Sequence, residues 1–395
     1  MDGRSERPAT GYGEPEAGLG TLTTGRVGHR RVRPYATRMA DLLELTSEGL
    51  YCRQGDFHVD PWRRVPRAVV THAHADHARP GCDRYLCAAR GKLVLRERVG
   101  GGAPIDTLRW GESLVINGVR VSLHSAGHVL GSAQVRLEHG GQVWVVSGDY
   151  KTQADPTADP FEPVECDVFI TESTFGLPIY RWAEPEQVAA AINAWWRENQ
   201  AAGRTSVILA YALGKAQRIA AMVDPSIGPI VAHGAVMKMV RAYRDSGVRL
   251  PPIDGVPPRA RRVGDGRALV IAPPSVAGSR WLRLFGEVSV APASGWMTVR
   301  GIRRRRGYER GFVLSDHADF PGLLGAIDAT RARRVLVTHG ASESLARLLR
   351  ERGLDAAPLA TRFTGESPPG DPSDDDAETA TVAPGDVHAG SEEDS

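Results

Sequence analysis

Five short apolar runs in this chain each lead into a residue that can bind a metal ion or transfer a proton. The runs lie at 68–71, 144–148, 169–171, 312–316 and 335–338, directly before His72, Asp149, Glu172, His317 and His339. Runs of this length, bounded by turn formers and alternating with helical patterns, indicate strands of a layered α/β fold. Because such folds commonly place sites at strand ends, we expect the five residues to lie along one rim and to form one site.

Local signals place several further elements. Apolar residues at helical spacing predict a helix over 185–200, and the Asn-Gly pair at 117–118 between two apolar runs predicts a hairpin. Asp319, which precedes a proline and an apolar stripe, is interpreted as a helix N-cap. Ser342 is interpreted as the cap of a second helix.

Length and cysteine content limit the class of protein. At 395 residues the chain exceeds the roughly 250–300 at which one hydrophobic core stops growing, so one large or two closely joined domains are expected. Four cysteines without a C-x-x-C pair exclude a disulfide scaffold and a zinc ribbon, so histidines and carboxylates must hold any metal. With neither a membrane span nor the apolar core of a signal peptide in this sequence, we expect a cytoplasmic protein that makes no membrane contact.

The charge of the chain is unevenly distributed. The formal net charge is +2, but residues 366–395 hold ten acidic side chains and no Lys or Arg, so the remainder is strongly basic. This excess favours a polyanionic partner, although the richness in Arg can also reflect coding bias. Residues 1–38, rich in turn formers, are predicted to be a flexible leader, and residues 366–395 a disordered acidic tail.

The densest group of ligand-type side chains lies at 72–77. His72 and His74 can bind one metal ion, and Asp76 and His77 a second, because alternate side chains of a loop diverge. Imidazole and carboxylate ligands suit zinc, and manganese or iron less decisively. The alternative, a polar surface loop without a metal, does not explain such a density of histidines.

A two-metal site needs more donors than these four side chains. His128, Asp149 and His339 each lie beside a glycine, which would let the backbone approach an ion closely, and Asp149 is suited to bridge two ions. Asp60, in preference to Asp56, is expected to orient a ligand imidazole without binding the metal itself.

Glu172 and His317 are left over by this count of ligands. They are expected to form a carboxylate–imidazole pair that acts on a phosphate or on a leaving oxygen. A serine triad at 315–317 is discounted, because triad members come together in space and do not stand in tandem.

Taken together, these segments resemble the metallo-β-lactamase superfamily. The 72–77 segment, His128 in Ala-Gly-His-Val-Leu-Gly, and Asp149 resemble its second, third and fourth motifs, and Asp60 its first. Three further residues resemble motifs A, B and C of the β-CASP nucleases within this superfamily, and the segment 211–217 resembles part of their inserted domain; the three are Glu172, His317 and His339.

The resemblance covers about 39–363 and implies an αββα sandwich with an inserted β-CASP α/β domain. Residues 39–182 would form the first part of the sandwich, 183–300 the insert, and 301–365 the return, with the site in the cleft between the two domains. It also implies two divalent metal ions, zinc or else manganese, and a nucleic-acid substrate.

Two local resemblances point to different nucleic acids. The segments 55–61 and 172–182 look most like bacterial DNA-ligase-associated exonucleases, which favours DNA and, as partners, an ATP-dependent DNA ligase and a helicase. A histidine at motif C, here His339, is instead the pattern of RNA-processing members. DNA repair is therefore the favoured role and RNA processing the alternative.

The expected reaction is phosphodiester hydrolysis by two metal ions. Asp76 would accept or position the proton of the attacking water, and His317, supported by Glu172, would neutralise the phosphate or protonate the leaving 3′ oxygen. Candidate phosphate contacts are Lys215 and the consecutive residues Arg303, Arg304, Arg305 and Arg306. A small-molecule acyl hydrolase and a non-catalytic nucleic-acid-binding subunit are the remaining alternatives.

Overall fold

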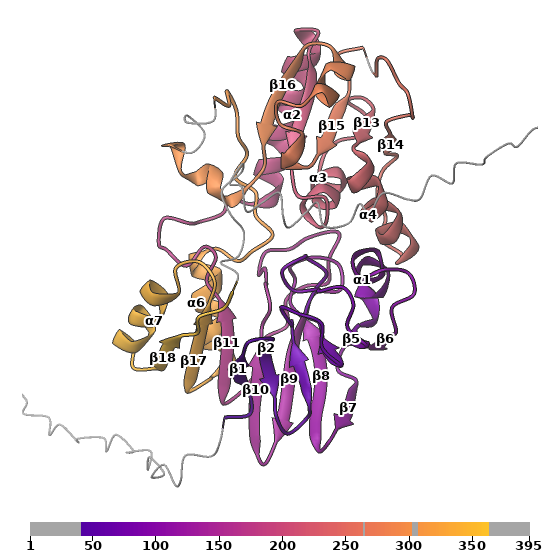
Figure 1. Cartoon of the computed structure of the whole chain (residues 1–395). Coiled ribbons are helices and arrows are strands. Elements are labelled where there is room, and N and C mark those ends of the chain that lie inside the picture. Colours follow the sequence, from indigo (N-terminus) through magenta and orange to yellow (C-terminus); the bar gives the residue numbers. More distant parts are fainter. Residues whose placement is uncertain (1–40, 264, 302–306, 363–395) are drawn as a thin grey trace, which may run out of the picture. The chain divides into compact units, whose positions relative to one another are not determined.

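The computed structural model describes residues 41–263, 265–301 and 307–362, which form three β-sheets and the helices that flank them (Figure 1). The leader predicted for 1–38 and the tail predicted for 366–395 lie outside the described residues. Among the described residues, no helix is long and apolar enough to cross a membrane.

The first two sheets pack face to face. The six-stranded sheet has the order β1-β2-β3-β4-β5-β6, and the seven-stranded sheet the order β18-β17-β11-β10-β9-β8-β7. Apolar side chains from both, such as Phe57 and Val69 of the first and Val135 and Ile170 of the second, fill one shared core. The strands of the first sheet are β1 (Glu44–Thr46), β2 (Gly49–Cys52), β3 (Phe57–Val59), β4 (Arg67–Val69), β5 (Arg84–Ala88) and β6 (Ile105–Leu108). Those of the second are β7 (Ser113–Ile116), β8 (Val119–Ser125), β9 (Ala133–His139), β10 (Gln142–Val146), β11 (Val168–Glu172), β17 (Arg334–Thr338) and β18 (Asp355–Pro358).

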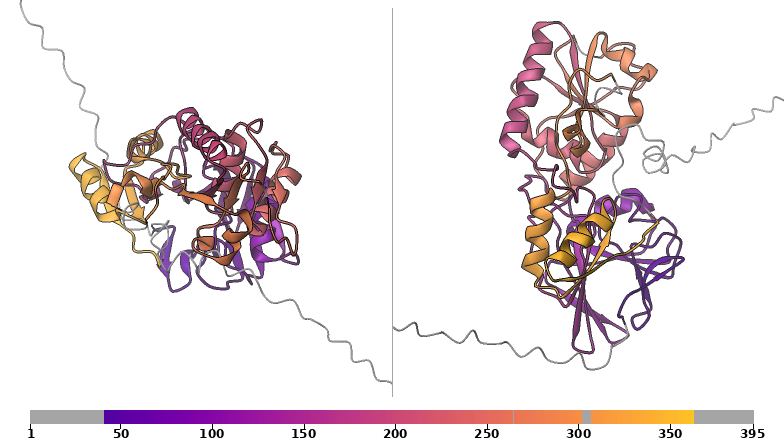
Figure 2. Two further views of the ribbon diagram at one scale, coloured as in Figure 1. Left: turned by 90° about the horizontal axis from the view of Figure 1, so that it is seen from above. Right: turned by 90° about the vertical axis from the view of Figure 1, so that its left-hand side faces the viewer.

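Helices cover the outer faces of this pair of sheets. Helices α6 (Phe320–Thr330) and α7 (Ser342–Glu351), in yellow and orange, lie on the second sheet, where Leu345 and Leu349 pack against Phe169 and Val335 (Figure 2). Helix α1 (Lys92–Val99) covers the first sheet. The result is the predicted αββα sandwich.

The third sheet is built from the chain between β11 and α6. Its five strands are all parallel, in the order β14-β13-β15-β12-β16, so crossover helices cover its face. Its strands are β12 (Thr205–Leu209), β13 (Ile230–Ala232), β14 (Asp254–Gly255), β15 (Leu269–Ala272) and β16 (Val288–Pro292), and its helices are α2 (Pro185–Ala201), α3 (Lys215–Met222) and α4 (Gly234–Asp245). The domain boundaries at 182, 300 and 365 stay predictions.

The local predictions are partly confirmed. Helix α2, the hairpin between β7 and β8, and the N-cap Asp319, whose Oδ1 accepts from the Gly322 amide at 2.9 Å, are as expected. The cap at Ser342 is wrong, because α7 begins at that residue and Ala341 occupies the N-cap without a side-chain bond. The run at 312–316 is no strand either; only Phe312 pairs, in a single bridge to Ala293.

Candidate metal centre

Strand ends of both packed sheets deliver the predicted ligands to one place. The loop after β4 carries His72, the loop after β10 carries Asp149, and His339 follows β17. Strands β11 and β17 run parallel with Glu172 opposite Thr338, so Glu172 and His339 lie at the same edge of the second sheet. Four of the five runs thus end at one rim as expected, and the fifth reaches it as a loop.

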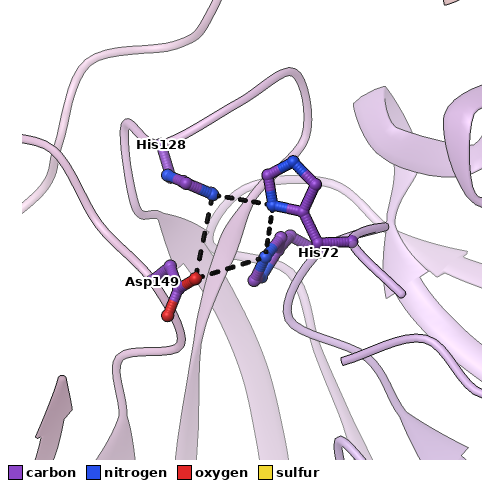
Figure 3. Close-up of side chains that lie close together, drawn as sticks. His72, His128 and Asp149 are labelled. Carbon is purple, nitrogen blue, oxygen red and sulfur yellow. Dashed lines mark hydrogen bonds and ion pairs between the residues drawn. The ribbon is translucent and has the colours of Figure 1, made fainter. Parts of the chain in front are cut away.

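One group of ligand atoms consists of three imidazoles and a carboxylate. The His74 Nδ1 lies 3.0 Å from the Nε2 atoms of both His72 and His128. The Oδ2 of Asp149 lies 3.6 Å from His72 Nε2 and 3.9 Å from His128 Nε2, and Figure 3 shows these side chains pointing toward one another. Four atoms tetrahedrally bound to zinc at ~2.1 Å would stand about 3.4 Å apart, so this group fits such an ion.

A second group shares Asp149 with the first. The Oδ1 of Asp149 lies 3.5 Å from His339 Nδ1, and its Oδ2 lies 3.6 Å from His77 Nε2. The carboxylate of Asp76 approaches the same His77 nitrogen at 3.5 Å and is partly exposed.

Three buried atoms of this second group have no hydrogen-bond partner: His77 Nε2, Asp149 Oδ1 and His339 Nδ1. An unsatisfied buried polar atom costs about 1–3 kcal/mol, so three of them converging on one point fit a cation that would bind all three. The residues present therefore suit metal binding at both groups.

Asp60 lies behind the second group. Its Oδ2 lies 2.7 Å from His77 Nδ1 and accepts a hydrogen bond from the Thr71 hydroxyl at 2.6 Å. Its Oδ1 accepts a hydrogen bond from the Thr71 amide at 2.8 Å. This arrangement directs the other nitrogen of His77 into the site. Asp56 instead contacts Tyr51 and Arg67 at the surface.

Burial and charge set the protonation of the ligands. Burial lowers the pKa of His72 and of His128 well below the ordinary value, which leaves their ring nitrogens free to bind a cation. Burial alone would also lower the pKa of His77, but the carboxylates of Asp76, Asp149 and Asp60 raise it well above the usual value. Burial would raise the pKa of Asp149, yet the surrounding imidazoles lower it well below its usual value.

Glu172 and His317 form a buried pair at the edge of the same centre. The His317 Nδ1 lies 3.0 and 2.9 Å from the two oxygens of Glu172, and the Tyr150 amide donates to the Oε1 of Glu172 at 2.8 Å. The imidazole is 4.0 Å from Asp149 Oδ2, and the Trp182 indole N–H donates to the His317 carbonyl at 2.9 Å. These contacts hold the ring of His317 beside both ligand groups.

Two of the glycines next to the ligands are required by the close packing of protein segments around them. Gly127 and Gly148 have φ of +75° and +57°, and a Cβ on them would lie 2.2 Å from the Lys151 carbonyl oxygen and 2.6 Å from the Thr71 Cβ. Each glycine therefore lets two protein segments approach each other, and the expected approach of the backbone to an ion stays a prediction.

Of the expected phosphate contacts, Lys215 lies within the described residues. Lys215 is fully buried at the start of α3, with its Nζ 4.8 Å from the centre of the Tyr211 ring, and its role in substrate binding stays a prediction. Arg303, Arg304, Arg305 and Arg306 lie outside the described residues. Sequence reasoning missed a cluster of buried charged side chains beside His128, formed by Lys151, Asp155, Arg218 and Asp316. Its signal in the sequence was that Lys151 follows Asp149 by two residues and that Asp316 directly precedes His317.

No family model matches the chain. A probable DNA ligase from Opitutus terrae is 33% identical over 313 residues, which are 78% of this chain and 30% of that protein. The endoribonuclease YSH1 of Yarrowia lipolytica is 30% identical over 124 residues, 30% of this chain and 14% of that protein. Cleavage and polyadenylation specificity factor 73 of Drosophila melanogaster is 32% identical over 122 residues, 30% of this chain and 18% of that protein.

These relatives, with the sandwich and the ligand spacing, decide the family. The chain belongs to the β-CASP group of the metallo-β-lactamase superfamily. This β-CASP protein spans less than a third of the length of each of the three relatives. A solved structure of a protein of unknown function from Enterococcus faecalis shares the fold, with a TM-score of 0.50 and 9% identity over 76% of this chain and 80% of that one.

Proposed function

We propose that this β-CASP protein is a nuclease that hydrolyses phosphodiester bonds with two divalent metal ions, zinc or else manganese. The observation that carries the proposal is the carboxylate of Asp149, shared by two buried ligand groups and lying 4.0 Å from the paired His317. A single ion at the first group would leave three further buried atoms without a partner, one of them Oδ1 of the same carboxylate.

In the proposed reaction the metal ions, Asp76 and the pair of Glu172 and His317 have different roles. When bound, the two cations would supply Lewis acidity, lowering the pKa of an attacking water and stabilising negative charge on the phosphate. Asp76, partly exposed beside His77, accepts the proton of that water. Glu172 accepts from Nδ1 of His317 and its negative charge stabilises the imidazolium form, in which Nε2 also carries a proton and donates it to the departing 3′ oxygen. The products are a 5′-phosphate and a 3′-hydroxyl end.

We further propose that the substrate is DNA and that the enzyme is an exonuclease of a ligase-associated repair pathway. The relative named a DNA ligase is 33% identical over 78% of this chain, whereas relatives named endoribonuclease match either 30% of it at 30% identity or 62% of it at 22% identity. An ATP-dependent DNA ligase and a helicase are the proposed partners. RNA processing is the second candidate, because His339 occupies a ligand position typical of RNA-processing members.

The test is cleavage of end-labelled single-stranded DNA and RNA of matched sequence, with Zn²⁺ or Mn²⁺ supplied. Asp149→Ala is the control, because Asp149 belongs to every ligand group. Loss of DNA in preference to RNA, absent from the control, supports the proposal, and the position of the label in the products gives the polarity. Cleavage of RNA alone would assign the protein to RNA processing.

Activity on a small thioester with both nucleic acids intact would instead make the protein an acyl hydrolase. Binding of nucleic acid without cleavage, together with a metal content near zero, would make it a non-catalytic binding subunit.

A further inference from the structure

Four buried charged side chains lie beside the metal centre but are not among its ligands: Lys151, Asp155, Arg218 and Asp316. None of these side chains is more than 4% exposed. Lys151 Nζ lies 2.5 Å from Asp155 Oδ2 and 4.0 Å from Asp316 Oδ1. Arg218 reaches the same two oxygens at 3.6 and 3.8 Å. Two positive and two negative charges balance, which is the condition under which buried ions are tolerated.

The four residues come from three separate parts of the chain. Lys151 and Asp155 follow Asp149 in the loop after β10, and Asp316 directly precedes His317. Only Arg218 comes from the segment that carries the third sheet, where it lies in α3. It therefore joins that segment to the two packed sheets.

Arg218 contacts the backbone as well as the carboxylates. Its Nη1 donates to the Ser315 carbonyl oxygen at 2.6 Å. The next carbonyl, that of Asp316, lies 2.8 Å from Nδ1 of His128, and Lys151 Nζ donates to the His128 carbonyl at 3.1 Å.

These contacts determine the tautomer of His128, one of the expected metal ligands. When Nδ1 of His128 donates to a carbonyl, its Nε2 carries no proton and presents a lone pair to His74 and Asp149. The position of the Asp316 carbonyl therefore selects the tautomer of His128 that binds a cation.

We propose that Arg218 is a positioning residue: by holding the Ser315–Asp316 backbone it orients His128, and it thereby sets the affinity of the group His72, His74, His128 and Asp149 for its cation. The inference rests on the proposed function only in treating this group as a cation site. Since the second group contains no His128, Arg218 affects one of the two cations.

A merely structural role for Arg218 makes a different prediction. If Arg218 only balanced charge, the variant Arg218→Met would leave one buried carboxylate uncompensated, and adding Asp316→Asn would repair the defect completely. The double variant restores neutrality, because Lys151 then faces Asp155 alone, but it still lacks the hydrogen bond to the Ser315 carbonyl. The two roles therefore separate in this pair of variants.

The experiment titrates metal-free full-length protein with Zn²⁺ in competition with a chelator and measures the thermal midpoint of each variant. We expect Arg218→Met to lose stability and to bind one of the two cations about 10–100-fold more weakly. We expect Arg218→Met/Asp316→Asn to regain stability but not affinity. The matched control is Arg197→Met in α2, where the arginine is exposed and pairs with Asp224; it should bind both cations as the wild type does.

A readout without metal completes the test. In metal-free protein with ¹⁵N-labelled histidine, the His128 resonance, assigned with His128→Gln, should report a proton on Nδ1 in the wild type and a mixture of tautomers in the double variant. Wild-type affinity in Arg218→Met, or recovery of affinity in the double variant, would overturn the positioning role alone. A wild-type protein that binds no divalent cation would overturn the proposed function, and this inference with it.

Discussion

The carboxylate of Asp149 and the imidazole of His317 differ in what they contribute, although their atoms lie 4.0 Å apart. Asp149 belongs to both ligand groups, and its loss would leave each group without the member that they share. His317 is held by Glu172 and the Trp182 indole, contacts that do not depend on the other histidines. In the proposed mechanism, therefore, Asp149 binds the metal ions and His317 takes part in the reaction.

This distinction predicts the behaviour of His317→Ala. The variant should lose turnover by about 10²–10⁴-fold, the usual contribution of a positioned acid or base, while it retains the metal content of the wild type. Turnover is measured on labelled oligonucleotide, and metal by elemental analysis of the same preparation. A variant that loses its metal would show that His317 is a ligand and not the proton donor.

Asp60 and Asp56 provide a matched pair in one short loop. Asp60 contacts His77 at 2.7 Å, whereas Asp56 pairs with Arg67 at 3.7 Å at the surface. Asp60→Ala should weaken one cation site by about 10–100-fold, because the ring of His77 loses the partner that orients it. Asp56→Ala should bind both cations with unchanged affinity in the same Zn²⁺ titration; equal losses in the two variants would contradict this role for Asp60.

At the level of elements, the N-terminal ends of α6 and α7 lead to different predictions for the stability of their variants. Asp319 caps α6 through the Gly322 amide and also accepts from the Trp182 amide at 3.0 Å. Asp319→Ala should lower the free energy of unfolding by about 1–2 kcal/mol. Ser342→Ala should change it by less than about 0.5 kcal/mol, because Ser342 makes no capping bond. Urea unfolding of both variants measures this. A loss of unfolding free energy in Ser342→Ala larger than about 0.5 kcal/mol would show that Ser342 caps α7 after all.

The same elements show what a sequence can reveal. Local patterns predicted α2, the hairpin and four strand ends correctly, since each depends on residues near in sequence. The failure at 312–316 has a long-range cause. That backbone is held by Arg218 and His128, which lie far away in the chain, so it needs no ladder of strand hydrogen bonds.

The burial of charged side chains is the second feature that the sequence could not predict. Lys215 was expected to contact phosphate; its side chain is fully buried, and this role stays a prediction. Arg218, three residues later, was not singled out, although it is equally buried and contacts the loop before His317. Whether a basic residue of a helix faces solvent or a buried carboxylate depends on the tertiary packing of that helix.

At the level of the whole molecule, the ligand groups join the two packed sheets. His72 and His77 follow β4 of the first sheet, whereas Asp149 and His339 follow strands of the second. A bound cation would therefore hold together segments that separate on unfolding, and its binding energy would add to the stability of the fold.

Metal removal should accordingly lower the thermal midpoint. At a free metal concentration 100 times the dissociation constant, one site adds about 2.7 kcal/mol, which corresponds to several degrees for a chain of this size. Scanning calorimetry with and without excess chelator measures the shift, and titration of the metal should move the midpoint with the logarithm of its concentration. Asp149→Ala is the control: because both groups share this carboxylate, its midpoint should not respond to the metal. If neither metal nor chelator shifts the thermal midpoint of the wild-type protein, these histidines and carboxylates bind no ion.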